Sequence, residues 1–445
     1  MAFEPGGYYA QPVPIRIPKA LEPLHPELNA NPMNLLYFHH FINHTGRITV
    51  PHDCPDNPFR TVLPQMAMRN TQLLHLLLAF SASHRARLLC HAEPANRIAA
   101  WMADVFPALR QALELSTPTH HTGDPTDPTP LAPLATALLL ASREIISPNN
   151  LDPSIPWQDH LQIARRMIIA KGGLHHLAHR SHGARDKTIF FLSRWFAYLD
   201  VFGSLSGNKH HGPLSDAYLE DGSGLWLVNR DNEEVFKIDC FFGFSGRCIA
   251  LLAQVAELAS ECDRHRIDPI TISIRTAWEP SDLVRQRTED LRKRLEASAT
   301  NVYQGCPHSF EPSPPTPNQP YDSEQLTAEI YATNTLFHLA GLLHLHRRCL
   351  NHPSSSPQIQ QLVTRTLQTL QHIRHNSTAE TCLLFPIFTA GCEALGTEQR
   401  EVFMSRLTAV EGWGMEQIAR ARSLMGRVWE TGRAWETLVQ GEFFG

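Results

Sequence analysis

The sequence lacks the motifs that mark the common enzyme classes. It contains no His-Glu-x-x-His zinc motif, no Gly-x-Ser-x-Gly elbow, no phosphate-binding loop and no Rossmann glycine pattern. No stretch with helical periodicity carries the paired aspartates with which helical enzymes bind magnesium. We therefore expect a protein that is not an enzyme, with a helical enzyme of an unrecognised kind as the alternative.

Cysteine is scarce, and its spacing does not fit a metal site. The chain has nine cysteines in 445 residues and no Cys-x-x-Cys pair. The closest pairs are Cys240/Cys248 and Cys382/Cys392, and Cys54/Cys90 lie much further apart. A structural zinc site needs shorter spacing than any of these. The odd number and the scatter predict reduced, mostly buried thiols in an intracellular protein.

Histidine, in contrast, is abundant, with 25 residues. His40/His44 and His175/His179 have the i, i+4 spacing that can hold a metal on one helix face. Neither pair has a third ligand close to it in the sequence. We therefore expect histidines that are solvated or satisfied in the core, and we expect neither a metal nor another cofactor.

Long apolar runs and a secretion signal are also missing. No stretch reaches the ~20 apolar residues that span a bilayer. The most apolar segment, near residues 241–259, is interrupted by Arg247 and Glu257. The first ten residues lack a basic start followed by an apolar run, so they do not resemble a signal peptide. We expect no membrane association.

Positive charge is not in excess, because the formal net charge is −5. The densest basic group consists of Arg285, Arg287, Arg292, Lys293 and Arg294. Glu289, Asp290 and Glu296 interrupt it, which is typical of a solvated helix face. The sequence therefore predicts no direct DNA binding by this chain.

The patterns that are present are helical. Apolar residues recur at helical spacing over most of the chain, and there is neither strand alternation nor a repeat of fixed period. Residues 1–30 are rich in proline and aperiodic, and we expect a disordered leader there. Proline-rich stretches at 117–130 and 307–320 predict mobile surface loops. We expect an all-α fold, with one helical domain over 31–445 that forms either two lobes or an extended array.

One stretch, residues 377–400, predicts a central buried helix. Ser377 and Glu380 have capping-box spacing, so a helix should start there. The segment that follows is apolar on nearly every face, which requires other helices around it. Pro386 should kink or restart this helix, and Gly391 should let a neighbouring helix approach closely.

Two sets of polar residues in apolar helices are candidate site residues. Glu393 must be paired if it is buried, and Arg400 or Arg406 on the next helix could form that structural ion pair. Arg194 and Tyr198 share one helix face and could line an effector pocket between helices. The alternative for Arg194 is a packed and paired arginine without a ligand.

Several short motifs together carry a family resemblance. Residues 384–394 read LFPIFTAGCEA, and further motifs lie at 55–64, 74–84 and 194–203, followed by Trp429 and Trp435. Taken in chain order, these motifs resemble those of the fungal-specific transcription factor domain, the helical regulatory region of fungal zinc-cluster transcription factors. The resemblance runs from about residue 34 to residue 444.

This resemblance implies a transcription-regulatory domain that acts in the nucleus. The implied roles are sensing of a small-molecule effector, homodimer formation and contact with the transcription machinery. The family's DNA-binding module needs six closely spaced cysteines, and the sequence shows no such cluster. Either an upstream segment is missing from the gene model, or the chain is a stand-alone regulatory domain. The alternative function is a stand-alone helical protein that binds a small molecule or a partner.

Overall fold

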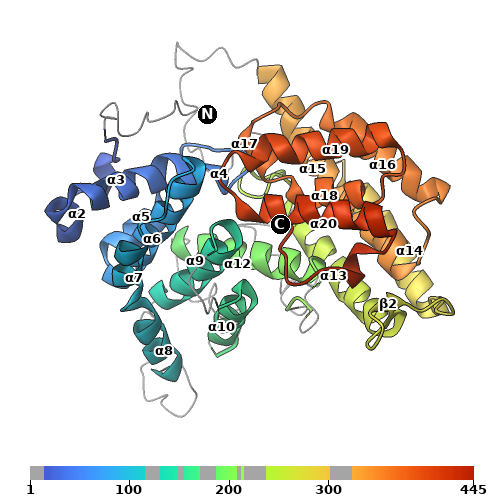
Figure 1. Cartoon of the computed structure of the whole chain (residues 1–445), viewed down its shortest axis with the longest axis horizontal. Helices are drawn as coiled ribbons and strands as arrows, with labels where there is room; N and C mark the ends of the chain where they lie inside the picture. Colours follow the sequence, from blue (N-terminus) through green and yellow to red (C-terminus); the bar gives the residue numbers. More distant parts are fainter. Residues whose placement is uncertain are drawn as a thin grey trace. The chain divides into compact units, whose positions relative to one another are not determined.

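Helices dominate the computed structural model of the chain (Figure 1). It describes residues 15–115, 131–148, 155–170, 187–207, 212–214, 237–300 and 323–445. Within these ranges the only strands are β1 (Ile267–Asp268) and β2 (Ser273–Ile274), which form an antiparallel hairpin. The all-α prediction is therefore confirmed. The loops predicted at 117–130 and 307–320 lie outside the described residues.

The chain forms two compact units, each assembled from several stretches. Unit 1 comprises Met1–Thr49, Asp56–Phe196 and Gly412–Glu416. Unit 2 comprises Val50–Pro55, Ala197–Glu411 and Gln417–Gly445.

Unit 1 is built around one buried helix. Its elements are η1 (Lys19–Leu21), α2 (Pro26–Ala30), α3 (Pro32–His40), η2 (Phe41–Thr45), α4 (Gly46–Ile48), α5 (Val62–Met68), α6 (Thr71–Leu88), α7 (Ala95–Met102), α8 (Val105–Leu115), α9 (Ala132–Ile146), α10 (Trp157–Ala170) and the first half of α12 (Lys187–Leu205). Helix α6 is the centre, because α3, α5, α7, α8 and α9 all contact it. It starts where the Asn70 side chain accepts a hydrogen bond from the Leu73 amide at 2.8 Å, an N-cap.

Part of the expected leader is ordered into short helices. The described part starts at residue 15 and includes η1 and α2. The apolar side chains of Leu21 and Leu28 are buried there. Proline at the start of α2 fits the first helical turn, where its missing N–H has no partner to lose.

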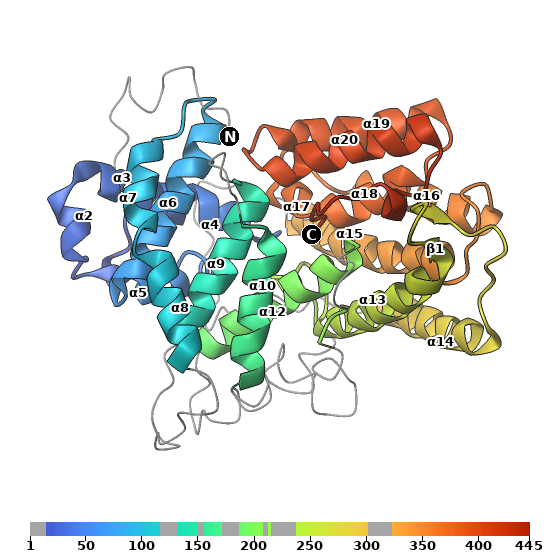
Figure 2. The same ribbon diagram turned by 60° about the horizontal axis from the view of Figure 1, so that its bottom comes forward.

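Unit 2 contains the C-terminal helices, which pack side by side in both views (Figures 1 and 2). Its elements are the second half of α12, α13 (Gly246–Arg266), the hairpin, α14 (Asp282–Ser298), α15 (Ser323–His344), η7 (Leu345–Cys349), α16 (Pro357–Leu370), α17 (Thr378–Thr381), α18 (Leu384–Cys392), α19 (Thr397–Glu411), α20 (Glu416–Thr431) and η8 (Trp435–Thr437). A π-helical turn, η7, follows α15 directly, and its residues Leu345, Arg348 and Cys349 are buried.

The predicted helix near residue 377 is in fact two helices. Ser377 caps α17 and accepts from the Glu380 amide at 3.2 Å, and the Glu380 carboxylate accepts from the Asn376 amide at 2.7 Å. The chain breaks before Leu384 and restarts as α18. Pro386 is the third residue of α18, where backbone N–H groups have no partner within the helix. The proline therefore begins a helix instead of kinking one.

Helix α18 is central to unit 2, as predicted. All nine of its residues are buried, and α15, α16 and α19 contact it. The Trp429 indole of α20 donates to the Gly391 carbonyl at 2.9 Å. A Cβ atom at Gly391 would overlap with the Met425 sulfur, so any side chain there must displace the end of Met425.

Candidate functional site

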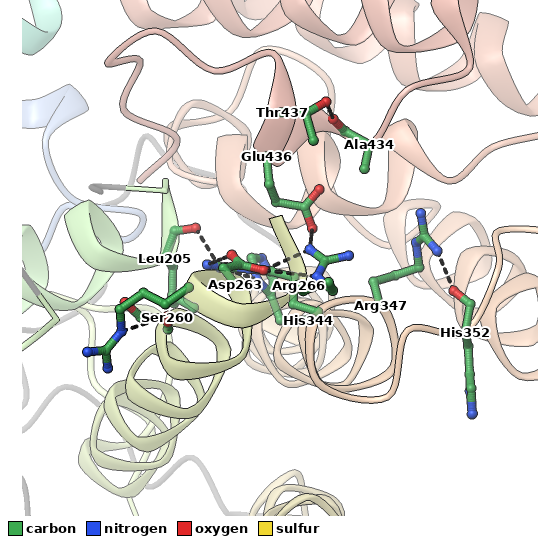
Figure 3. Close-up of polar contacts among 12 residues, drawn as sticks. Leu205, Ser260, Asp263, Arg266, His344, Arg347, His352, Ala434, Glu436 and Thr437 are labelled. Atoms are coloured by element: carbon green, nitrogen blue, oxygen red, sulfur yellow. Dashed lines mark hydrogen bonds and ion pairs between the residues drawn. The ribbon is translucent and has the colours of Figure 1, made fainter. Parts of the chain in front are cut away.

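Unit 2 contains a network of four charged side chains, three of them buried and Asp263 partly exposed, shown in part in Figure 3. Asp263 and Arg266 come from the last turn of α13, Arg348 from η7 and Glu436 from η8. Arg266 Nη2 lies 2.8 Å from Asp263 Oδ1 and 3.0 Å from Glu436 Oε1. Arg348 Nη2 lies 2.7 Å from the other oxygen of Asp263. Asp263 therefore bridges the two arginines.

The network is both deeply buried and charged. The Arg266 side chain is 0% exposed, and Glu436 is buried as well. Burial on its own raises the pKa of Glu436, but the Arg266 and Arg348 guanidinium groups outweigh it, and the pKa is lowered. Burial likewise lowers the pKa of Arg266, but Glu436 and Asp263 reverse the shift and raise it. These groups stay ionised because each one satisfies the other.

Arg348 is held by more than its ion pair. Its Nη1 atom donates to the Leu205 carbonyl at 3.1 Å and lies 3.2 Å from Nδ1 of His344. Its guanidinium carbon lies 5.5 Å from the centre of the Trp435 ring, within cation–π range. The side chain therefore connects α12, α15 and the C-terminal turn η8.

The residues after η8 are fastened to the same unit. Phe444 stacks on Phe388 of α18 with ring centroids 3.9 Å apart, and its amide donates to Ser206 Oγ at 2.9 Å. The Trp435 ring packs edge-on against both phenylalanines. The charged network and this aromatic cluster together fix the C-terminal segment, residues 435–444, to the core of unit 2.

Sequence reasoning missed this network. The run Asp263-Arg264-His265-Arg266 at a helix end is its only local signal, since basic residues there are favoured by the helix dipole. Nothing near Glu436 in the sequence indicates a buried partner 170 residues away.

Glu393 is buried and ion-paired, but its partner differs from the expected ones. Its Oε2 atom lies 2.8 Å from Arg347 Nε and accepts from Ser354 Oγ at 2.6 Å. Arg347 belongs to η7, far away in the sequence, so helix spacing could not identify it.

The two arginines expected near Glu393 have other roles. Arg406 pairs with Glu380 at 2.8 Å and donates to the Ile373 carbonyl at 3.0 Å, so it forms a structural ion pair between α19 and α17. Arg400 donates to the Ala394 carbonyl at 2.9 Å and lies over the Trp429 ring.

Arg194 and Tyr198 fall in different units, although they are one turn apart on α12. Arg194 is buried, and its guanidinium lies 4.8 Å from the centre of the Phe190 ring on the same helix. Tyr198 is half-buried and packs its ring against Phe202, and burial raises the pKa of its hydroxyl. Their role in an effector pocket stays a prediction.

Unit 1 has its own polar cluster, formed by buried histidines. His84 Nε2 lies 2.9 Å from the Trp413 carbonyl, which can only accept, so this nitrogen carries the proton. His84 Nδ1 then accepts from Thr45 Oγ1 at 2.9 Å, and His40 Nε2 lies 3.3 Å from it. Burial lowers the pKa of His84 and of His44 to about 4. These rings are therefore neutral at pH 7.

Of the two histidine pairs noted in the sequence, one lies in this cluster. His40 and His44 stack with centroids 4.9 Å apart, while His175 and His179 lie outside the described residues. Among the residues that the structure describes, no group of three or more His, Cys, Asp or Glu side chains is placed to hold a metal ion. No helix in this part of the chain combines the length and the apolar character needed to cross a bilayer.

The densest basic group, on α14, is neutralised by its neighbours. Arg292 lies 2.8 Å from Glu289 and 2.7 Å from Glu296. Arg294 pairs with Asp290 at 3.2 Å. The remaining ion pairs are Arg285–Glu279, Arg287–Glu261 and Lys293–Glu289. The face is thus a lattice of solvated ion pairs.

Comparison with known proteins identifies the family. The family model described as "Fungal specific transcription factor domain" matches residues 36–441, nearly the whole chain and all the motifs noted in the sequence. No curated protein and no solved structure shows significant similarity to the chain. The family regulates transcription, which points to a protein that is not an enzyme, and it implies a nuclear location. The chain belongs to the fungal-specific transcription factor domain family.

Proposed function

We propose that the chain controls transcription through contacts with a small-molecule effector or a partner protein, and that it does not read DNA itself. The partners in this proposal are a second copy of the chain or the transcription machinery. The nucleus is the place of action that the family implies.

The observation that carries the proposal is the charge pairing on α14. A protein that binds DNA needs lysine and arginine side chains that can neutralise phosphates. Each basic residue of the α14 group already has a carboxylate within 4.0 Å. DNA would have to displace these pairs and would meet the repulsion of the acids that remain.

A second support is the burial of the strongly interacting polar groups. The network around Arg266 has its charges paired, and the histidines around His84 are neutral. Neither offers an accessible nucleophile or an acid–base pair for catalysis. Both act as scaffolding for a helical domain whose surface makes the functional contacts.

The test is a tethered reporter. The chain is fused to a heterologous DNA-binding module in a fungal host, and the output of a promoter that carries the module's site is measured. We expect an output that differs from that of the module alone and that changes with growth conditions. The matched control fuses the module to the Gly391→Leu variant, which should lose the effect because α18 is disrupted. A fusion that is expressed, nuclear and folded, yet gives the output of the module alone under every condition, would contradict the proposal.

The proposed effector pocket at Arg194 and Tyr198 is tested separately, through a variant of Tyr198. Tyr198→Phe removes a hydroxyl and little volume, so it should keep the fold. A thermal-shift screen of metabolites against the wild type and this variant asks whether a stabilising compound loses its effect. The same screen, followed by product analysis, detects turnover if the chain is an unrecognised enzyme.

A further inference from the structure

Two thiols from distant parts of the sequence meet in unit 2. Cys54 lies on the segment 50–55, and Cys240 lies on the loop before α13. The Cys240 Sγ atom lies 3.6 Å from Cys54 Sγ, and both side chains are buried and reduced. We propose that this pair is a modification site: a dithiol that a hydroperoxide converts into a reversible disulfide.

The loop that carries Cys240 has a fixed backbone. The Asp239 amide donates to the Phe244 carbonyl at 3.2 Å, and the Gly243 amide donates to the Asp239 carbonyl at 2.7 Å. Ile238 and Ser245 close the loop through a β-bridge. Gly243 has a φ of +78°, which favours glycine. The position of Cys240 is therefore set by hydrogen bonds that do not involve its thiol.

The segment that carries Cys54 is held against this loop independently of the sulfurs. The His52 amide lies 3.4 Å from the Cys240 carbonyl, and Thr378 Oγ1 donates to the Pro51 carbonyl at 2.9 Å. A Cβ atom at Gly243 would lie 2.8 Å from Pro51 Cγ, so only glycine permits this approach. Because hydrogen bonds already hold the two backbones next to each other, disulfide formation would bring the sulfurs from 3.6 Å to about 2.05 Å.

Access distinguishes this pair from the other buried thiols. Cys54 is 9% exposed and is followed directly by the exposed residues Pro55 and Asp56. A second neighbouring pair, Cys262 and Cys349, is 2% and 0% exposed. Of these two buried pairs, a small oxidant should therefore reach Cys54 and Cys240 first, because oxidation follows exposure. The exposed Cys90 can also be oxidised, so the disulfide is identified by peptide mapping and not by thiol loss alone.

The chemistry balances with a hydroperoxide as the oxidant. The Cys54 thiolate attacks a peroxide oxygen, the O–O bond breaks, and a sulfenic acid and one water (an alcohol if the peroxide is organic) are formed. The Cys240 thiolate then attacks the sulfenic sulfur, the S–S bond forms, and a second water leaves. Two thiols lose two electrons, which reduce the peroxide. A thiol reductant such as glutathione or thioredoxin reverses the step.

The disulfide would have a structural consequence because of where segment 50–55 lies in the chain. The segment belongs to unit 2, while the stretches before and after it, Met1–Thr49 and Asp56–Phe196, belong to unit 1. The bond would fasten this short excursion of the chain to unit 2 covalently. Local opening of the segment is then blocked in the oxidised chain and allowed in the reduced one.

The test is peroxide oxidation of the purified full-length chain. The chain is treated with hydrogen peroxide, alkylated under native conditions and digested without reductant. We expect mass spectrometry to find a peptide pair linked through Cys54 and Cys240, the loss of two titratable thiols, and recovery of both with dithiothreitol. Linkage through Cys262 and Cys349 instead, or oxidation without a linked pair in a chain that stays folded, would overturn the proposal.

Two variants sharpen the result. In Cys240→Ser the sulfenic acid on Cys54 has no resolving thiol, so a dimedone adduct should accumulate there. Cys262→Ser is the matched control and should form the Cys54–Cys240 link at the wild-type rate. Circular dichroism checks that both variants fold, and the wild-type mapping decides the question if either does not. A dimedone adduct on Cys54 that is as strong in the wild type as in Cys240→Ser would show that Cys240 does not resolve it.

Discussion

Two buried polar clusters, one in each unit, accommodate their side chains in opposite ways. In unit 1, His40, His44 and His84 are desolvated and neutral, because burial lowers their pKa. In unit 2, Arg266 and Glu436 are equally buried but stay charged, because each compensates the other. One cluster avoids charge, and the other pairs it.

The comparison teaches that the two clusters should fail under different conditions. A neutral buried histidine destabilises the fold when it is protonated, since burial disfavours its charged form. A buried ion pair tolerates protons but not the loss of one member, because the remaining charge is then isolated. Mutation should therefore test the charged network around Arg266, and pH should test the histidine cluster around His84.

The largest effect is expected from Glu436→Gln. The change removes a charge that faces Arg266 and Arg348 and leaves Asp263 to compensate both guanidinium groups. Breaking a buried pair in this way typically costs about 3–5 kcal/mol. Urea unfolding followed by circular dichroism measures it, and Glu296→Gln on the exposed face of α14 is the control, with no loss expected. Wild-type stability of Glu436→Gln would mean that the network contributes little.

Acid should destabilise the chain through the histidine cluster. The folded pKa of His84 is about 4, against about 6.5 in an unfolded chain, so the unfolded state binds the proton first. Its contribution is complete above pH 6.5 and is lost as the pH falls toward 4, at a cost of up to about 3 kcal/mol. The pKa of Glu436 is lowered from 4.5, so the charged network should survive over this range.

The measurement is the free energy of unfolding from pH 7 to pH 4.5. In His84→Gln the free energy of unfolding should decrease less as the pH falls, because one histidine fewer is protonated on unfolding. His372→Gln, at an exposed position, should leave the pH dependence of this free energy unchanged. Equal slopes for wild type and His84→Gln would show that His84 is not buried in its neutral form.

A smaller effect is expected from Gly391→Leu. The new side chain overlaps with Met425 and contacts Phe403, so the packing of α19 and α20 against α18 must readjust. Overpacking of this kind typically costs about 1–3 kcal/mol. Gly426→Leu on α20 is the matched control, because a Cβ atom there meets no other atom within 4 Å. A melting temperature of Gly391→Leu that equals that of the control would contradict the central position of α18.

The smallest effect is expected from Arg292→Gln on α14. Its partners Glu289 and Glu296 are solvated, and water replaces the lost ion pairs. The melting temperature should not change measurably. A clear decrease would show that the α14 lattice stabilises the fold, and the contrast with the buried network would weaken.

The sequence predicts helices better than contacts. The capping pair Ser377 and Glu380 and the apolar run of α18 predicted a central helix, because these are local signals. The restart at Leu384 was one of two predicted alternatives, and the sequence could not decide between them because the same proline fits both a kink and a helix start.

The partners of the buried polar side chains could be identified only from the structure. The apolar residues around Glu393 in the sequence predict its burial. Its partner Arg347 lies in the π-helical turn η7, which no sequence pattern predicts. The pairs Arg266–Glu436 and Cys54–Cys240 are likewise set by tertiary packing over 170 and 186 residues. Helical periodicity relates only residues that are a few positions apart, so it cannot predict these contacts.

The central claim, regulation of transcription without DNA reading by this chain, is tested most directly by selection from DNA. The purified chain is incubated with a pool of random-sequence duplexes at ~0.15 M salt, where the Debye length is about 8 Å and weak phosphate contacts are screened. We predict no enriched motif, because the basic residues of α14 are already paired with acids. Enrichment of a defined motif under these conditions would contradict the account.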